Sequence, residues 1–134
     1  FDAAIEEVWH VITHTGYANA YPTIFGENAG SSLTNAMDIA RGGNFMTIPN
    51  SYPASAWYTY DDQTCEYDCM ATEYIYWAMT SILGAQEKRL NEIAQEWVLN
   101  TRTLVENTDT TIYSLLTDTQ YMFPTVLPDG TYKQ

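Results

Sequence analysis

The sequence predicts a single, mainly α-helical domain covering residues 1–134, with long, irregular, aromatic-rich loops and at most a minor β element. Several segments place apolar residues at the i, i+3, i+4 spacing of one helix face. Glycine and proline separate these segments from one another. A hydrophobic fraction of 46% and an aromatic fraction of 14% are typical of a chain that buries a compact core.

The first expected helix covers residues 2–15. Its apolar stripe consists of Ile5, Val8, Trp9 and Ile12. The opposite side of the helical projection carries Glu6, Glu7, His10 and His14. We therefore expect the core contact and the chemistry to use different faces of this helix.

The next segments are separated by clear breakers. Residues 16–30 are expected to form a loop that packs its rings inward. Ser31 or Ser32 then caps a short helix that ends at Gly42-Gly43. Residues 44–64 lack helical periodicity, so their rings are expected to cover the core, with a short strand at 56–60. The alternative for this long connection is a lid or a binding loop.

The second half of the chain is expected to hold three more helices. Residues 70–86 are apolar on nearly every side, which predicts a central buried helix. Residues 86–100 have the pattern of an amphipathic helix, and Asp109 can cap a helix at 110–117. Pro124, Pro128 and the Asp129-Gly130 turn then predict an irregular tail that lies on the surface.

Two histidines and one glutamate form the candidate site. His10 and His14 are four residues apart, so on a helix both imidazoles can chelate one ion. Glu73 is the only charged residue in the central helix. An ionised carboxylate there needs a cation, a hydrogen-bond network or a raised pKa. The three residues together predict a divalent-metal site, with zinc as the expected ion.

At this point the chain resembles the zincin metallopeptidases of the gluzincin type, which carry two histidines on one helix and a glutamate ligand on a later helix. The matching positions are His10, His14 and Glu73. The family motif has a catalytic Glu directly after the first histidine, where this chain has Val11. Because valine cannot accept a proton, the resemblance implies metal binding without conventional peptidase activity. Glu6 or Glu7 is the remaining candidate for a general base in a hydrolase.

Structural explanations compete with the metal site. The histidines can lie on a solvated helix face, and Glu73 can accept a hydrogen bond from a Tyr hydroxyl or a backbone amide. Cys65 and Cys69 are the only cysteines, and their spacing allows a disulfide, which would favour an exported, extracellular or periplasmic protein. Two reduced cysteines, or a Cys2His2 zinc site with His10 and His14, are the alternatives.

The composition narrows the functional classes. Seventeen acidic and five basic residues give a net charge of −12, which disfavours nucleic acids and anionic membrane surfaces as partners. No apolar run approaches the roughly 20 residues of a membrane span. The chain contains no GxSxG, GxxxxGK[ST] or GxGxxG motif. The leading hypothesis is a zincin-like metal-binding domain. The rival is an exported, metal-free structural or protein-interaction domain, with a protein or peptide as the candidate partner.

Overall fold

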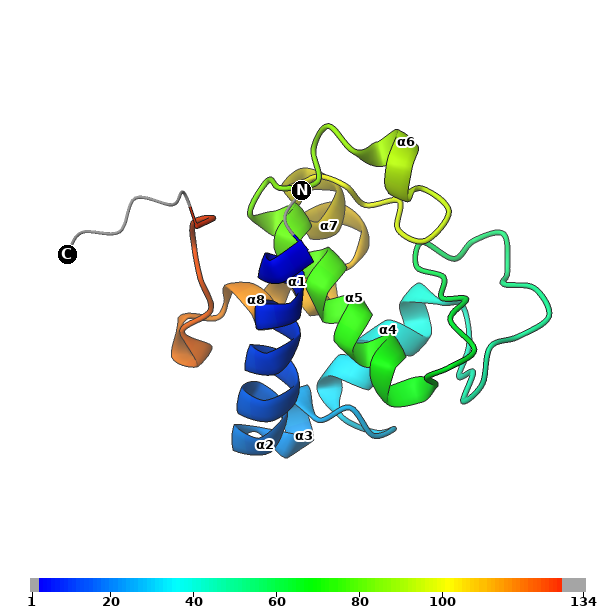
Figure 1. Cartoon of the computed structure of the whole chain (residues 1–134), viewed down its shortest axis with the longest axis horizontal. Coiled ribbons are helices and arrows are strands. Elements are labelled where there is room, and N and C mark those ends of the chain that lie inside the picture. The colour runs from blue at the N-terminus through cyan, green and yellow to red at the C-terminus, as the bar shows by residue number, and fades with distance from the viewer. Residues whose placement is uncertain (1–2, 129–134) are drawn as a thin grey trace.

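The computed structural model describes residues 3–128, and within them it confirms the mainly α-helical fold (Figure 1). The first half contains α1 (Ala3–His10), the π-helical segment η1 (Val11–Tyr17), α2 (Ala18–Ala20), α3 (Pro22–Phe25) and α4 (Ser32–Ala40). The second half contains α5 (Tyr67–Ile82), α6 (Leu90–Ile93), α7 (Arg102–Thr108), α8 (Thr110–Thr117) and the 3-10 turn η2 (Thr119–Tyr121). No strand occurs in residues 3–128, where one isolated antiparallel bridge joins Tyr58 to Trp97.

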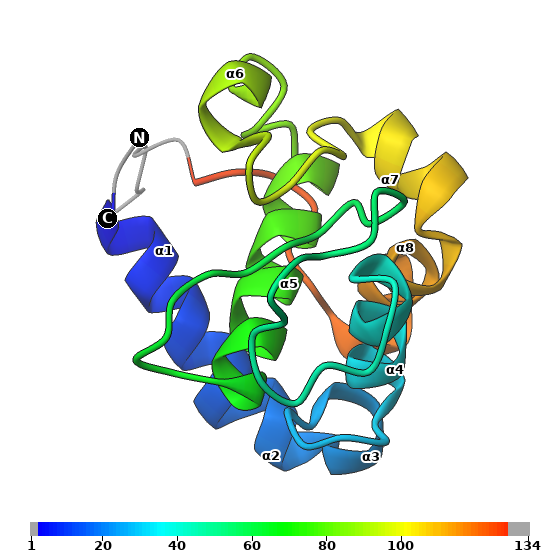
Figure 2. The same cartoon turned by 90° about the vertical axis from the view of Figure 1, so that its right-hand side faces the viewer.

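Helix α5 lies at the centre of the molecule (Figure 2). It contacts α1, α4, α7 and α8, and most of its residues from Met70 to Ile82 are buried. The prediction of a central buried helix is therefore confirmed, although the helix begins earlier and ends earlier than expected. None of the helices described is both long and apolar enough to span a bilayer.

The irregular segment 44–64 covers the core with its rings, as expected. Tyr58 is fully buried, and its hydroxyl donates a hydrogen bond to the Met70 carbonyl at 2.8 Å. Its ring lies 5.5 Å from that of Tyr74 and 6.3 Å from that of Trp97. The expected strand at 56–60 is reduced to the single bridge at Tyr58, and backbone hydrogen bonds to Ala40 and Glu96 also hold the segment.

A buried aspartate joins this segment to the helices. Asp109 accepts hydrogen bonds from Trp57 Nε1 at 2.9 Å and from the Tyr74 hydroxyl at 2.7 Å. Its other oxygen accepts from the Ile112 amide and caps α8, as predicted. The predicted cap of α4 is also present, since Ser31 Oγ accepts from the Thr34 amide at 3.0 Å.

Two predicted elements are wrong. The expected loop at 16–30 is helical as far as Ala20, and α3 then starts at Pro22, because proline is tolerated in a first helical turn. The expected amphipathic helix at 86–100 is reduced to α6. Trp97 is fully buried, and the backbone around it pairs with segment 44–64 through Thr59 N to Glu96 O at 2.8 Å, so tertiary contacts replace the helix there. Helix α7 was not predicted, and the expected Asp129-Gly130 turn lies outside the described residues.

The orientation of α1 also differs from the prediction. Ile5, Val8 and Ile12 are 44%, 59% and 43% exposed, whereas Thr13 is buried and His10 is only half-buried. The polar side of the helix therefore turns toward α5. The apolar stripe instead borders a groove beside the C-terminal segment.

The two cysteines form a disulfide at the entrance to α5, with Cα atoms 5.8 Å apart. This confirms the disulfide interpretation and excludes the Cys2His2 zinc site, because disulfide sulfurs are not thiolate ligands.

Reduction of the disulfide opens a loop of only about five residues, so it should lower the free energy of unfolding by about 2 kcal/mol. Urea melts with and without reductant measure this change, and identical midpoints would contradict it.

Candidate functional site

A change of helix type separates the two predicted histidine ligands. α1 is a regular α-helix as far as His10, and the π-helical segment starts at Val11. The Ala18 amide donates to the Thr13 carbonyl, which is the i→i+5 bond of a π-helix. His14 therefore does not continue the α-helical register of His10. Glu6 and His10 do share that register, one turn apart.

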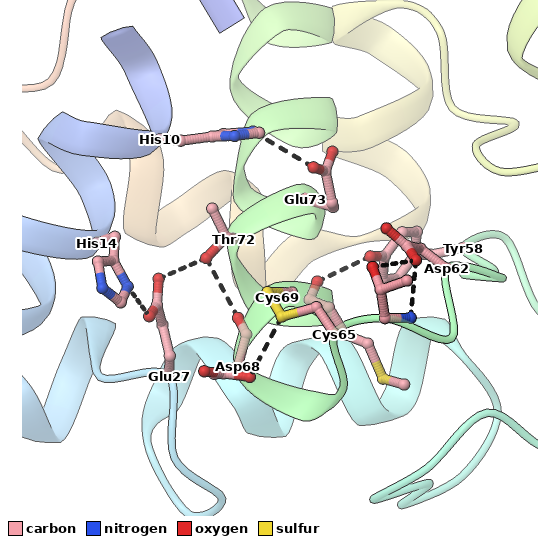
Figure 3. Close-up of a disulfide and its surroundings, with 12 residues drawn as sticks. His10, His14, Glu27, Tyr58, Asp62, Cys65, Asp68, Cys69, Thr72 and Glu73 are labelled. Atoms are coloured by element: carbon pink, nitrogen blue, oxygen red, sulfur yellow. Dashed lines mark hydrogen bonds and ion pairs between the residues drawn. A yellow bond between two sulfur atoms is a disulfide. The ribbon is translucent and has the colours of Figure 1, made fainter. Parts of the chain in front are cut away.

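The structure brings Glu6, His10 and Glu73 together between α1 and α5. One ligand atom from each of these side chains lies within 4.8 Å of the others. His10 Nε2 is 3.5 Å from Glu73 Oε1, with side chains only 18% and 23% exposed (Figure 3). Two of the three predicted site residues are thus neighbours, and Glu6 joins them.

His14 belongs to a different cluster. Its Nδ1 lies 2.5 Å from Oε2 of Glu27, a residue that is 8% exposed. The other oxygen of Glu27 accepts a hydrogen bond from Thr72 Oγ1 at 2.7 Å. In Figure 3 the His14 ring turns toward Glu27, whereas His10 turns toward Glu73. The structure therefore does not assemble the predicted His10, His14 and Glu73 set.

The environment of Glu73 disfavours its ionised form. Burial is the main cause, and the neighbouring carboxylates Glu6, Glu96 and Glu7 add to it, so the pKa of Glu73 rises from 4.5 to about 8. The same two effects raise the pKa of Glu96. At neutral pH the metal-free site therefore retains a proton that a cation would displace.

The buried polar atoms that lack a hydrogen-bond partner include one from the candidate site. Within residues 3–128, five buried side-chain N or O atoms lack a hydrogen-bond partner. Two of them, Trp9 Nε1 and His10 Nε2, belong to α1, whereas the Tyr76 hydroxyl and Trp77 Nε1 on α5 lie beside the carboxylates of Glu6 and Glu96. Such atoms are few in native proteins and commonly mark a site for water, an ion or a ligand. His10 Nε2 is thus a buried imidazole nitrogen of the candidate site that no hydrogen bond satisfies.

The three clustered side chains fit a borderline divalent ion. Tetrahedral zinc with bonds of roughly 2.0–2.2 Å places its ligand atoms about 3.3 Å apart. The 3.5 Å separation of His10 Nε2 and Glu73 Oε1 is close to that value. One imidazole and two carboxylates form a mixed N/O donor set that zinc accepts.

The hydrogen-bonded alternative for Glu73 has less support. Among the described residues, its carboxyl accepts no hydrogen bond from a Tyr hydroxyl or a backbone amide, and its raised pKa reflects burial and like charge. The sequence analysis placed Glu73 in the candidate site but assigned Glu6 only as a candidate base. The signal for Glu6 was its i, i+4 spacing from His10. Nothing in the sequence pattern pointed to Glu27.

Comparison of the chain with protein-family models, curated proteins and solved structures yields no significant match. The chemistry of the site is therefore inferred from its own geometry.

Proposed function

We propose that this protein is a divalent-metal-binding domain that holds zinc between α1 and α5 through Glu6, His10 and Glu73. The observation that carries the proposal is the convergence of these three donors, with His10 Nε2 unpartnered and 3.5 Å from a carboxyl whose pKa is about 8. A bound cation would offset the repulsion between the Glu6 and Glu73 carboxylates. It would also be coordinated by the lone pair of the free imidazole nitrogen of His10.

Conventional peptidase activity is not part of the proposal. Zinc in such a site supplies Lewis acidity. The zincin resemblance places a general base directly after the first histidine, and this chain has Val11 there, 63% exposed. Glu6, the nearest alternative base, is assigned here as a ligand. We therefore infer a zincin-like metal centre that serves binding or stability.

The proposed compartment and partners rest on the disulfide and on the net charge. A disulfide between Cys65 and Cys69 is compatible with an oxidising compartment, so we infer an exported protein. With a net charge of −12, nucleic acids are not expected among its partners.

A metal-free interaction domain is the second candidate function. The alternative interpretation of segment 44–64 as a binding loop does not favour it, because Tyr58 and Tyr60 of that segment are buried. The exposed stripe of Ile5 and Val8 on α1 and Ile12 on η1 does favour it. This candidate predicts that the purified protein contains no stoichiometric metal.

Elemental analysis after dialysis against zinc tests the proposed function. We expect about one zinc per chain in the wild type and less than a tenth of that in His10→Ala. His14→Ala is the matched control, because its imidazole binds Glu27 and should be dispensable for the metal. Absence of zinc from the wild type would favour the metal-free candidate. Equal loss from both histidine variants would restore the ligand set predicted from the sequence.

A further inference from the structure

A second group of metal-ligating side chains lies at the entrance to α5. Cys65 precedes this helix, Cys69 lies in its first turn, and Asp68 lies between them in the sequence. One ligand atom from each of the three side chains lies within 4.8 Å of the others. Asp68 Oδ1 is 3.9 Å from the Cys65 sulfur (Figure 3). This group shares no residue with the metal centre proposed between α1 and α5.

The disulfide keeps this group closed to a metal. Its two sulfurs are bonded to each other, and metals bind the thiolate form of cysteine. A dithiol reductant breaks the sulfur–sulfur bond by exchange, becomes a disulfide itself and leaves two thiols on the protein. A divalent ion that binds both sulfurs then displaces the two thiol protons. Metal binding at this position therefore depends on the redox state of the cysteines.

The reduced group has the spacing of a tetrahedral site. Zinc bonds of about 2.3 Å to sulfur and about 2.1 Å to oxygen place two sulfurs about 3.8 Å apart, and a sulfur and an oxygen about 3.6 Å apart. The 3.9 Å from Cys65 Sγ to Asp68 Oδ1 is already close to the second value. The first value requires the two sulfurs to separate by about 1.7 Å from their bonded distance. Because Cys65 lies outside α5, its side chain can make this adjustment without breaking the helix.

Accessibility and charge favour a cation at this position. Both cysteines are half-buried and Asp68 is exposed, so a reductant and an ion reach them from solvent. The net charge of −12 attracts cations to the protein surface. Two thiolates and one carboxylate prefer a borderline or soft ion such as zinc or cadmium, whereas Mg²⁺ and Ca²⁺ prefer oxygen ligands alone. The two histidines of the alternative Cys2His2 site are paired with glutamates instead.

We propose that reduction of the disulfide opens a second metal site, in which the thiolates of Cys65 and Cys69 and the carboxylate of Asp68 bind zinc. Exchange with another disulfide re-forms the bond between Cys65 and Cys69, removes both thiolate ligands and releases the ion. In an oxidising compartment the site is therefore closed. The proposal does not depend on the first metal centre, since its donors are different.

Cadmium binding followed by ultraviolet absorption tests this proposal, because a cadmium–thiolate bond gives a charge-transfer band that oxygen and nitrogen ligands do not give. We expect no band from the oxidised wild type. After reduction with a phosphine, the wild type should bind one cadmium ion through sulfur. Zinc should displace this ion, whereas a large excess of Ca²⁺ should not. The band does not report a metal held by the first centre, so the failure of one proposal is distinguishable from the failure of the other.

Three variants identify the ligands. Cys69→Ser should abolish the band. Asp68→Asn should weaken cadmium binding roughly tenfold or more, because it removes a charged ligand while keeping the side-chain size. Glu66→Gln is the matched control and should change the affinity less than about threefold, since Glu66 is also exposed but lies outside the donor group and its charge is screened. Circular dichroism of the reduced variants separates the loss of a ligand from unfolding.

The absence of a cadmium band from the reduced wild type would overturn the proposal. Equal losses of affinity in Asp68→Asn and Glu66→Gln would also overturn it, because the carboxylates would then act only by general attraction. Loss of the band in His14→Ala would assign the thiolates to a Cys2His2 site instead. Displacement of cadmium by Ca²⁺ would reduce the site to a surface cluster of carboxylates.

Discussion

Replacement of Glu73 by Gln should stabilise the metal-free protein by about 4 kcal/mol near pH 8. The folded-state pKa of Glu73 is about 8, against 4.5 for an unperturbed Glu. A shift of this size corresponds to roughly 5 kcal/mol of differential interaction at full ionisation. Gln has nearly the same volume as a protonated Glu and carries no charge at any pH. It therefore removes the free-energy cost of either burying the ionised carboxylate or protonating it at pH 8.

The sign of the pH dependence follows from proton binding. Between pH 4.5 and about pH 8, the folded state retains the Glu73 proton that the unfolded state has released. Stability contributed by this group is therefore present below pH 4.5 and is lost as the pH rises toward 8. Glu73→Gln should flatten that decline.

Urea unfolding in the presence of a chelator, repeated from pH 4 to pH 9, measures this effect. Glu106→Gln is the matched control, since Glu106 is exposed on α7 and should change the free energy of unfolding by less than about 0.5 kcal/mol. A Glu73→Gln variant that is less stable than the wild type at pH 8 would contradict the description of Glu73 as a buried carboxyl that is destabilised by the neighbouring carboxylates.

Replacement of Arg41 by Met should destabilise the protein by about 3–5 kcal/mol. Arg41 is fully buried, and its guanidinium donates to Asp38 Oδ1 at 2.7 Å and to the Phe45 carbonyl at 2.8 Å. Its charge also lies over the ring of Tyr67, 5.3 Å from the centroid. The substitution leaves Asp38 largely buried with only the Tyr67 hydroxyl as a donor, at 2.9 Å.

A double-mutant cycle separates the ion pair from the packing. Asp38→Asn combined with Arg41→Met should recover 1–2 kcal/mol of the sum of the single effects, because neither charge is then left alone. Arg102→Met is the matched control, since exposed Arg102 lies over Tyr113 and should cost less than about 1 kcal/mol. A loss in Arg41→Met as small as that in Arg102→Met would contradict the assigned role.

Local signals in the sequence were sufficient for several elements. Ser31 and Asp109 cap the helices that they were expected to cap, because capping depends on residues within one turn. The apolar composition around Glu73 correctly indicated a buried central helix and an unusual carboxylate. The spacing of Cys65 and Cys69 indicated a disulfide.

Long-range contacts determined the features that could not be predicted. Trp97 pairs with Tyr58, almost forty residues earlier, and this contact ends the helical pattern expected at 86–100. The π-helical segment turns His14 away from His10, and the His14 imidazole pairs with the carboxylate of Glu27, which lies on a loop. The apolar stripe of α1 predicted the wrong face, because the side bearing His10 and Thr13 packs against α5.

Competition titration of zinc against a chromophoric chelator tests the central claim most directly, with wild type, Glu6→Gln and His14→Gln compared side by side. The account predicts one zinc per wild-type chain, an affinity loss of at least tenfold in Glu6→Gln, and a change below about threefold in His14→Gln. A tenfold loss in His14→Gln with Glu6→Gln unchanged, or no zinc binding by the wild type, would contradict the assignment of Glu6, His10 and Glu73 as the metal ligands.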